Sequence, residues 1–221
     1  CGFAGIINAD RNEPADGRKI KMMMDAIIHR GPDDEGLEVM GNVGFGFRRL
    51  SIVDLSHGHQ PLYDAARRAC VVFNGEIYNH HELKSELIQK GVAFQTNSDT
   101  EVLVNAYLEF GLSFVNRLRG MFAFAIFDFN KNSVILGRDP FGIKPLYFRL
   151  TNHALHFASE IKAIARLGGD FHFNYESLDS YFSYGYTTGK NSFYQEIERI
   201  EKVMSWYLTF TNLHCMAFLS H

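Results

Sequence analysis

The sequence predicts an α+β fold in which mainly antiparallel sheets lie between two helical layers. Strand-like and helix-like segments come in runs along the chain, whereas a parallel sheet would need the two to alternate strictly. The predicted strand at 121–129 carries Phe at alternate positions and is joined to the next predicted strand by a polar turn at 130–132. With 221 residues, of which 46% are apolar and 14% aromatic, the chain can fill a large core.

The first part of the chain predicts a strand, a helix and a hairpin in that order. Residues 1–8 form an apolar run, which is typical of a buried strand. Residues 18–29 carry apolar side chains at helical spacing and end at the breaker pair of Gly31 and Pro32. Residues 36–53 contain several glycines, which favours short strands joined as a hairpin.

The middle of the chain predicts a short strand followed by helices. Residues 71–73 form a β-branched strand that is predicted to run into a turn at Asn74 and Gly75. Asn79 is predicted to cap a helix that continues to about residue 90. The remaining elements are a helix from the Ser98 and Asp99 caps to Gly111, strands at 121–129 and 133–137, a hairpin at 146–150 and 154–158, helices at 160–167 and 176–184, and a last strand at 204–210.

Composition argues against several classes of partner. A net charge of −3 and a pI near 6.4 give no basic surface for nucleic acid. The apolar runs are far shorter than a membrane span, and no basic leader precedes the first of them, so we expect no membrane partner. Three widely spaced cysteines (Cys1, Cys70 and Cys215) form neither a disulfide framework nor a metal pattern, which favours a reducing, cytoplasmic location.

The chain begins with Cys1, which puts a thiol and an α-amino group on one residue. A thiol with a pKa near 8.5 is only slightly ionised at neutral pH and needs a base to take its proton. An α-amino group, with a pKa of about 7.7 to 8.0, can be that base. The alternative interpretation is that Cys1 merely marks where the chain was cut.

Five further positions are candidates for binding an amide substrate. The Asn74 side chain and the Gly75 N–H could together form an oxyanion hole, although an Asn-Gly pair is more often a simple turn. Arg49 lies at a predicted strand end, where a guanidinium can grip a carboxylate or can simply face solvent. Glu76 and Asp99 would suit an ammonium group, but each could equally be a charge at a helix start.

Other chemistry has little support in the sequence. A phosphate-binding GxxxxGK[ST] loop is absent, and the glycines at 44 and 46 lack the third glycine of a dinucleotide fingerprint. The histidines at 57, 59, 80 and 81 have neither an HExxH motif nor paired Cys/His spacing, so we expect no metal site.

A set of motifs occurs in one order along the chain. They are CGFAG at 1–5, HRGPD at 29–33, RLSIVD at 49–54, NGEIYNH at 74–80, SDTE at 98–101, GMFAFAIF at 120–127, RDPFGIKPLY at 138–147 and SEIK at 159–162. On these motifs the chain resembles the glutaminase domain of glutamine-hydrolysing asparagine synthetases. That domain is a class II glutamine amidotransferase and an N-terminal-nucleophile hydrolase.

The resemblance implies a four-layer αββα sandwich of two mainly antiparallel sheets between helical layers. It implies that Cys1 attacks the side-chain amide of L-glutamine while Asn74 and Gly75 hold the oxyanion. It also implies a substrate pocket in which Arg49 binds the α-carboxylate and Glu76 and Asp99 bind the α-ammonium. Main-chain atoms of Leu50, Ser51, Ile52 and Val53 would line this pocket, and the motifs at 29–34 and 138–145 would belong to the scaffold.

The resemblance further implies that the amidotransferase domain covers residues 1–200, with a divergent tail at 201–221. No cofactor is expected for the glutaminase step. ATP and Mg are expected only for a synthetase domain, which has no counterpart in the 221 residues and would be the partner that accepts ammonia. A homodimer stays open, as do three alternatives: an amidotransferase for another acceptor or a stand-alone glutaminase, a non-catalytic remnant, and a peptide-cleaving hydrolase of the same fold.

Overall fold

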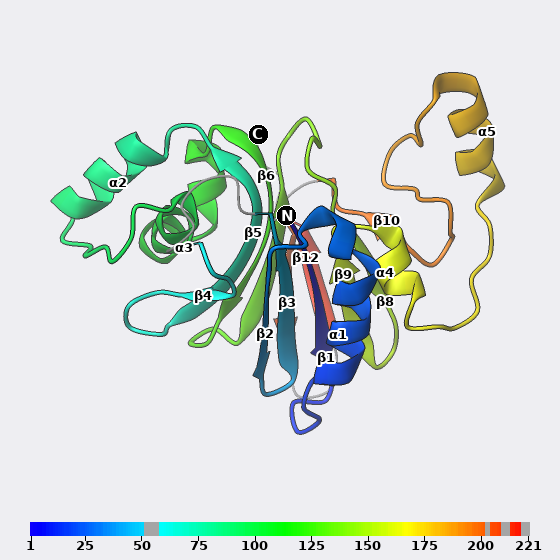
Figure 1. Cartoon of the computed structure of the whole chain (residues 1–221), viewed down its shortest axis with the longest axis horizontal. Coiled ribbons are helices and arrows are strands. Elements are labelled where there is room, and N and C mark those ends of the chain that lie inside the picture. Colours follow the sequence, from blue (N-terminus) through cyan, green and yellow to red (C-terminus); the bar gives the residue numbers. More distant parts are fainter. Residues whose placement is uncertain (51–57, 202–203, 209–212, 218–221) are drawn as a thin grey trace.

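The computed structural model describes residues 1–50, 58–201, 204–208 and 213–217. Two six-stranded sheets pack face to face, with helices covering the outer face of each (Figure 1). The strand pairings are antiparallel in both sheets. The predicted α+β class and the four-layer αββα sandwich are therefore confirmed.

The first sheet contains the N-terminal strand at its interior and has the order β10-β8-β9-β1-β3-β2. Strand β1, the N-terminal strand, pairs on one side with β3 and on the other with β9. The strands of this sheet are β1 (Gly2–Asn8), β2 (Asp34–Met40), β3 (Val43–Arg49), β8 (Tyr147–Leu150), β9 (Ala154–Ala158) and β10 (Glu198–Arg199).

The second sheet has the order β12-β11-β7-β6-β5-β4. Its strands are β4 (Leu62–Tyr63), β5 (Ala69–Ile77), β6 (Gly120–Asp128), β7 (Ser133–Arg138), β11 (Met204–Leu208) and β12 (Leu213–Ala217). The last two strands extend the sheet beyond β7, so part of the predicted divergent tail adds to the sheet edge.

The helices form the two outer layers and one projecting element. Helices α2 (His80–Gln89) and α3 (Asp99–Phe110) lie on the second sheet, followed by the 3₁₀ segment η2 (Gly111–Arg117). Helix α1 (Gly17–Ala26), the 3₁₀ turn η1 (Ile28–Arg30) and α4 (Ile161–Ala165) lie on the first sheet. Helix α5 (Tyr175–Tyr184) projects away from both sheets, at the right of Figure 1. None of the described helices is long and apolar enough to cross a membrane.

Helix α1 packs closely on β3 because that strand offers glycines. The side chain of Asp16 caps the helix by accepting from the N–H groups of its first turn. A Cβ atom on Gly44 would lie 2.3 Å from Ile20, and one on Gly46 would lie 2.4 Å from the sulfur of Met24. The glycines that the sequence analysis assigned to a hairpin thus let the helix approach the sheet.

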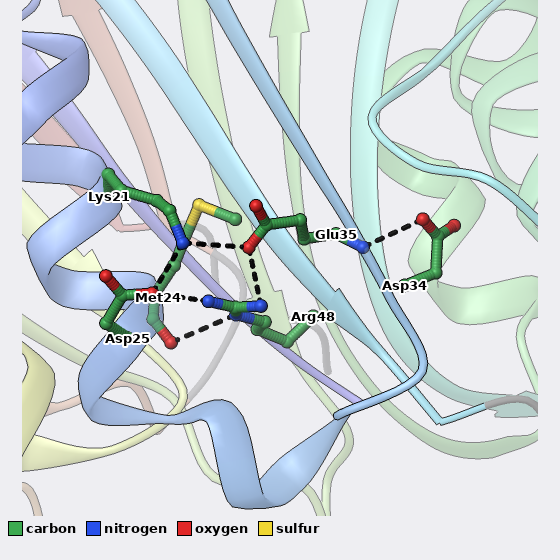
Figure 2. A network of polar contacts seen from close by, with 6 residues as sticks. All are labelled: Lys21, Met24, Asp25, Asp34, Glu35 and Arg48. Carbon is green, nitrogen blue, oxygen red and sulfur yellow. Dashed lines mark hydrogen bonds and ion pairs between the residues drawn. The ribbon is translucent and has the colours of Figure 1, made fainter.

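A buried arginine joins α1 to the strands beside the N-terminus (Figure 2). Arg48 forms ion pairs with Asp25 and Glu35, and Lys21 bonds both of these carboxylates. Arg48 lies opposite Gly2 in the β1–β3 register. This network therefore fixes the strand that runs next to Cys1.

Two local predictions were wrong in the same region. Asn74 and Gly75 do not form a turn, because β5 continues through them and pairs with β6 as far as Ile77. Asn79 is the N-cap residue of α2, but its side chain makes no capping bond and instead bonds the backbone of Arg117 and Arg119. In both cases pairing with a distant segment overrides a local propensity.

Candidate active site

Cys1 lies at the start of β1, between the ends of the two sheets. Because Gly2 pairs with Arg48, Cys1 comes to the level of Arg49 on the neighbouring strand. The N–H of Leu50 donates to the Cys1 Sγ over 3.4 Å, and Sγ lies 3.8 Å from the Leu50 carbonyl oxygen. Cys1 is half-buried and packs against the core between the sheets. The thiol is therefore held by backbone contacts and by packing.

The α-amino group of Cys1 is poised to accept a proton at neutral pH. Burial, and then the positive charges of Arg30 and Lys144, lower its pKa from 8.0 to about 6. An amine with that pKa is mostly uncharged at pH 7 and lies on the same residue as the thiol. A thiol and an amine that can accept its proton therefore share one residue.

Arg30 fixes the main chain of Cys1. Its Nε donates to the Cys1 carbonyl oxygen over 2.9 Å, and its Nη1 donates to Glu160 over 3.0 Å. His29 and Lys162 contact the same carboxylate and hold Glu160 in place beside the guanidinium. Gly2 gives this side chain room, since a Cβ there would lie 2.9 Å from the Arg30 Cδ.

Asn74 offers an unused hydrogen-bond donor toward the core between the sheets. Side chains alternate along β5, and Cys70 and Val72 both belong to the core against which Cys1 packs. Asn74 has the same parity, is 4% exposed, and lies opposite Ala123 of that core. Its Nδ2 has no partner among the described residues. A buried amide without a partner is costly to fold, which points to a ligand oxygen as its partner.

The backbone of β5 places the Gly75 N–H on the strand's outer edge. The N–H of Tyr78 points toward β6, whereas Phe73 and Ile77 donate away from β6, to Gln60 Oε1 and Asp99 Oδ2. By the same alternation the Gly75 N–H points away from β6, between these two anchored groups. Only glycine fits here, because a Cβ would lie 2.1 Å from the Met121 carbonyl oxygen.

The two predicted ammonium-binding carboxylates lie near this edge. Asp99 opens α3 and accepts the Ile77 N–H over 3.1 Å, while Glu76 on β5 is exposed. Burial raises the pKa of Asp99, against hydrogen bonds that lower it, and the nearby charge of Glu76 raises it further. A cation bound between them would offset this unfavourable negative charge.

Arg49 is a buried side chain at the end of β3. It is 7% exposed, and a Cβ on Gly58 would lie 2.2 Å from its Nη2. Its charge lowers the pKa of Asp34, although less than the hydrogen bond from His59 does. The structure therefore places a fixed guanidinium on the strand beside Cys1, not an ordinary surface arginine. The predicted lining residues Ser51, Ile52 and Val53 lie outside the described residues.

Two charged groups near Cys1 come from motifs that were predicted to belong to the scaffold. Arg30 holds the Cys1 carbonyl, and Lys144 lies near enough to affect the pKa of the amine. Arg138 donates from Nε to the Lys144 carbonyl over 2.7 Å, and Asp139 accepts the Lys144 N–H. The motifs at 29–33 and 138–147 contain these residues, but nothing local indicates that they reach the N-terminus.

The described residues hold no group of three His, Cys, Asp or Glu side chains that could bind a metal ion. The predicted site residues that the structure describes provide a thiol, an amine with a lowered pKa, a buried amide donor, a backbone N–H and charges of both signs. Such a set suits acyl transfer from a substrate that carries both a carboxylate and an ammonium group.

The chain matches the family model described as a glutamine amidotransferase domain over residues 1–215. Asparagine synthetase 1 (glutamine-hydrolyzing) of Bacillus subtilis is 42% identical over 208 residues, which cover 91% of this chain and 32% of that protein. Asparagine synthetase B (glutamine-hydrolyzing) of Escherichia coli is 40% identical over 166 residues, covering 74% of this chain and 30% of that protein. The chain thus spans about a third of the length of these relatives.

Solved structures share the fold at low sequence identity. Glutamine phosphoribosylpyrophosphate amidotransferase from B. subtilis, complexed with ADP and GMP, superposes with a TM-score of 0.70 at 20% identity. That comparison covers 100% of this chain and 50% of the other. A structure described as the allosteric regulatory enzyme of purine biosynthesis gives a TM-score of 0.71 at 21% identity. At this identity the likeness concerns the fold alone.

Proposed function

The chain belongs to the glutamine amidotransferase domain family, and on that premise we propose that it hydrolyses L-glutamine through a thioester on Cys1. The products are glutamate and ammonia. The observation that carries the proposal is the buried Asn74 Nδ2, which lacks a partner among the described residues and belongs to the face of β5 against which Cys1 packs.

The reaction begins with transfer of the thiol proton to the uncharged amine of Cys1. The sulfur then attacks the side-chain amide carbon of glutamine, and the carbonyl oxygen becomes an oxyanion. The Asn74 side chain and the Gly75 N–H donate to this oxyanion. Donors of this kind are each worth about 10² to 10³ in rate.

Collapse of this tetrahedral adduct breaks the C–N bond. The proton held by the Cys1 amine goes to the leaving nitrogen, so that ammonia departs and a γ-glutamyl thioester remains. Water then attacks the thioester, with the amine again taking the proton, and glutamate is released. Atoms and charge balance without any cofactor.

Recognition of both ends of free glutamine explains the charges around the thiol. Arg49 binds the α-carboxylate, while Glu76 and Asp99 bind the α-ammonium group. The main chain of Leu50, which contacts the Cys1 thiol, lies beside the substrate. A substrate embedded in a peptide has neither charge, which disfavours a peptide-cleaving role.

We also propose that the ammonia serves amidation of aspartate, with ATP and Mg acting in a synthetase portion outside the 221 residues. This rests on the names of the relatives, of which the chain spans about a third. A reducing, cytoplasmic location fits this role, because Cys1 must remain a free thiol.

The test is a glutaminase assay on the purified 221-residue chain, measuring glutamate and ammonia. Wild type is expected to be active, and Cys1→Ala to be folded and inactive. An electrophilic glutamine analogue is expected to add one label at Cys1, and mass analysis of the N-terminal peptide also reports whether its amine is free. Activity in Cys1→Ala equal to that of wild type would contradict the mechanism.

A further inference from the structure

Strand β4 begins at Leu62, opposite Val71, and therefore does not cover the edge of β5 from which the Gly75 N–H points. Leu62 pairs with Val71, and continuing that register places Gln60 opposite Phe73. Pro61, between Gln60 and Leu62 in the sequence, has no N–H to donate. If β4 started earlier in the same register, the main chain of Gln60 would be the hydrogen-bond partner of Phe73.

The side chain of Gln60 takes the place of that backbone partner. Its Oε1 accepts the Phe73 N–H over 2.6 Å, and its Nε2 donates to the Phe73 carbonyl over 3.2 Å. The Gln60 main chain is directed elsewhere, because a Cβ on Gly36 of β2 would lie 1.8 Å from its carbonyl oxygen. Gln60 thus contacts both sheets and is 6% exposed.

A third bond extends the contact to α3. The Gln60 Nε2 lies 3.4 Å from the Thr100 Oγ1. Thr100 follows Asp99, which in turn accepts the Ile77 N–H of β5. One amide therefore connects the strand that carries Asn74 and Gly75 with the helix that carries Asp99.

We propose that Gln60 is a positioning residue that sets the direction of the two oxyanion donors by acting as the strand partner of Phe73. This inference rests on the proposed function. Phe73 directly precedes Asn74, and its N–H and the Gly75 N–H point to the same edge of β5. If Phe73 loses its partner, its peptide can rotate and carry both donors away from the oxyanion. A displacement of about 1 Å at a reacting group costs about 10²-fold in rate.

The test compares Gln60→Met, which keeps the side-chain length without its polar atoms, with wild type. We expect kcat for glutamine to fall about tenfold to a hundredfold while KM changes little, because the loss concerns the transition state. The matched control is Asn8→Leu. Asn8 is also a buried amide that donates to two backbone carbonyls, but it lies at the far end of β1 from Cys1. It is expected to lose stability and keep kcat.

A double-mutant cycle separates positioning from general destabilisation. In an Asn74→Ala background, Gln60→Met is expected to cost clearly less than in wild type, because one of the donors that Gln60 positions is already gone. Equal losses in both backgrounds would overturn the proposal. So would a kcat in Gln60→Met within twofold of wild type.

Two milder variants keep the test decisive if Gln60→Met does not fold. Thr100→Val removes only the helix contact and is expected to lower kcat about fivefold, the effect of one neutral hydrogen bond. Gln60→Glu keeps an acceptor for the Phe73 N–H and is expected to retain more activity than Gln60→Met or, failing that, Gln60→Leu. A Thr100→Val enzyme with wild-type kcat would contradict the proposed positioning role of Gln60. An inactive wild-type chain would instead overturn the proposed function itself.

Discussion

The Nε of Arg30 donates to the carbonyl oxygen of Cys1 over 2.9 Å, and its charge helps to lower the pKa of the Cys1 amine to about 6. The same side chain therefore fixes the main chain of Cys1 and lowers the pKa of its amine. Glu160, on the far side of the guanidinium, holds it in that orientation.

Arg30→Gln is expected to move the acidic limb of the pH profile of kcat/KM upward from about 6. The amine must be uncharged to accept the thiol proton, so activity rises with pH through the amine pKa. Burial is the largest cause of the low pKa and remains in the variant, so the limb should move only part of the way toward 8.0. Lys144→Met, which removes a weaker influence, should move it less. An unchanged limb in Arg30→Gln would contradict this account.

Asn74→Ala is expected to lower kcat by about 10² to 10³, with little change in KM, because it removes an oxyanion donor. Steady-state kinetics with glutamine measure both values. The control is Asn42→Ala, since Asn42 is another buried amide but bonds the Asn8 carbonyl. If both variants lost the same fraction of kcat, the role of Asn74 would be structural.

Gly75→Ala is expected to reduce both stability and activity. The new Cβ would meet the Met121 carbonyl at 2.1 Å, which must separate β5 from β6 locally. Overpacking of this kind costs about 1 to 3 kcal/mol, which thermal unfolding can detect. Gly17→Ala provides the comparison, because a Cβ there meets its nearest neighbour at an ordinary 3.6 Å. A Gly75→Ala protein as stable as Gly17→Ala would show that the strand has room to adjust.

Asp99→Asn is expected to stabilise the protein at neutral pH while weakening glutamine binding. The pKa of Asp99 is raised above 3.8 by burial, so above that pH the folded state binds more protons than the unfolded state. Its contribution to stability therefore falls as pH rises through this range. Asparagine avoids this loss and can still accept the Ile77 N–H.

The loss of the ammonium contact in Asp99→Asn should raise KM about tenfold to a hundredfold, as expected for a hydrogen bond to a charged group. Denaturant unfolding at several pH values and glutaminase kinetics give the two readings. The exposed Asp170→Asn should change neither. A lower stability of Asp99→Asn at pH 7 would show that the carboxylate is favourable where it lies.

The sequence predicts the fold class and most elements because periodicity and turn residues are local signals. It also predicts Cys1, Asn74 and Arg49 as site residues through short motifs. It misassigns Asn74 and Gly75 to a turn, since an Asn-Gly pair is a strong local signal while its pairing with β6 is long-range. Contacts between distant segments, such as Arg30 with Glu160, leave no periodic trace for local reasoning to find.

Strand β5 is paired by β4 only as far as Val71 in the part of the chain that the structure describes. An open strand edge is ordinarily a risk, because another chain can add to it and start aggregation. Here the side chains of Gln60 and Asp99 accept the N–H groups of Phe73 and Ile77, and the Gly75 N–H lies between these two positions. A longer β4 would protect this edge but would cover the Gly75 N–H, which is proposed to donate to the oxyanion. Attempts to make this protein more resistant to aggregation should therefore not extend β4 before Leu62.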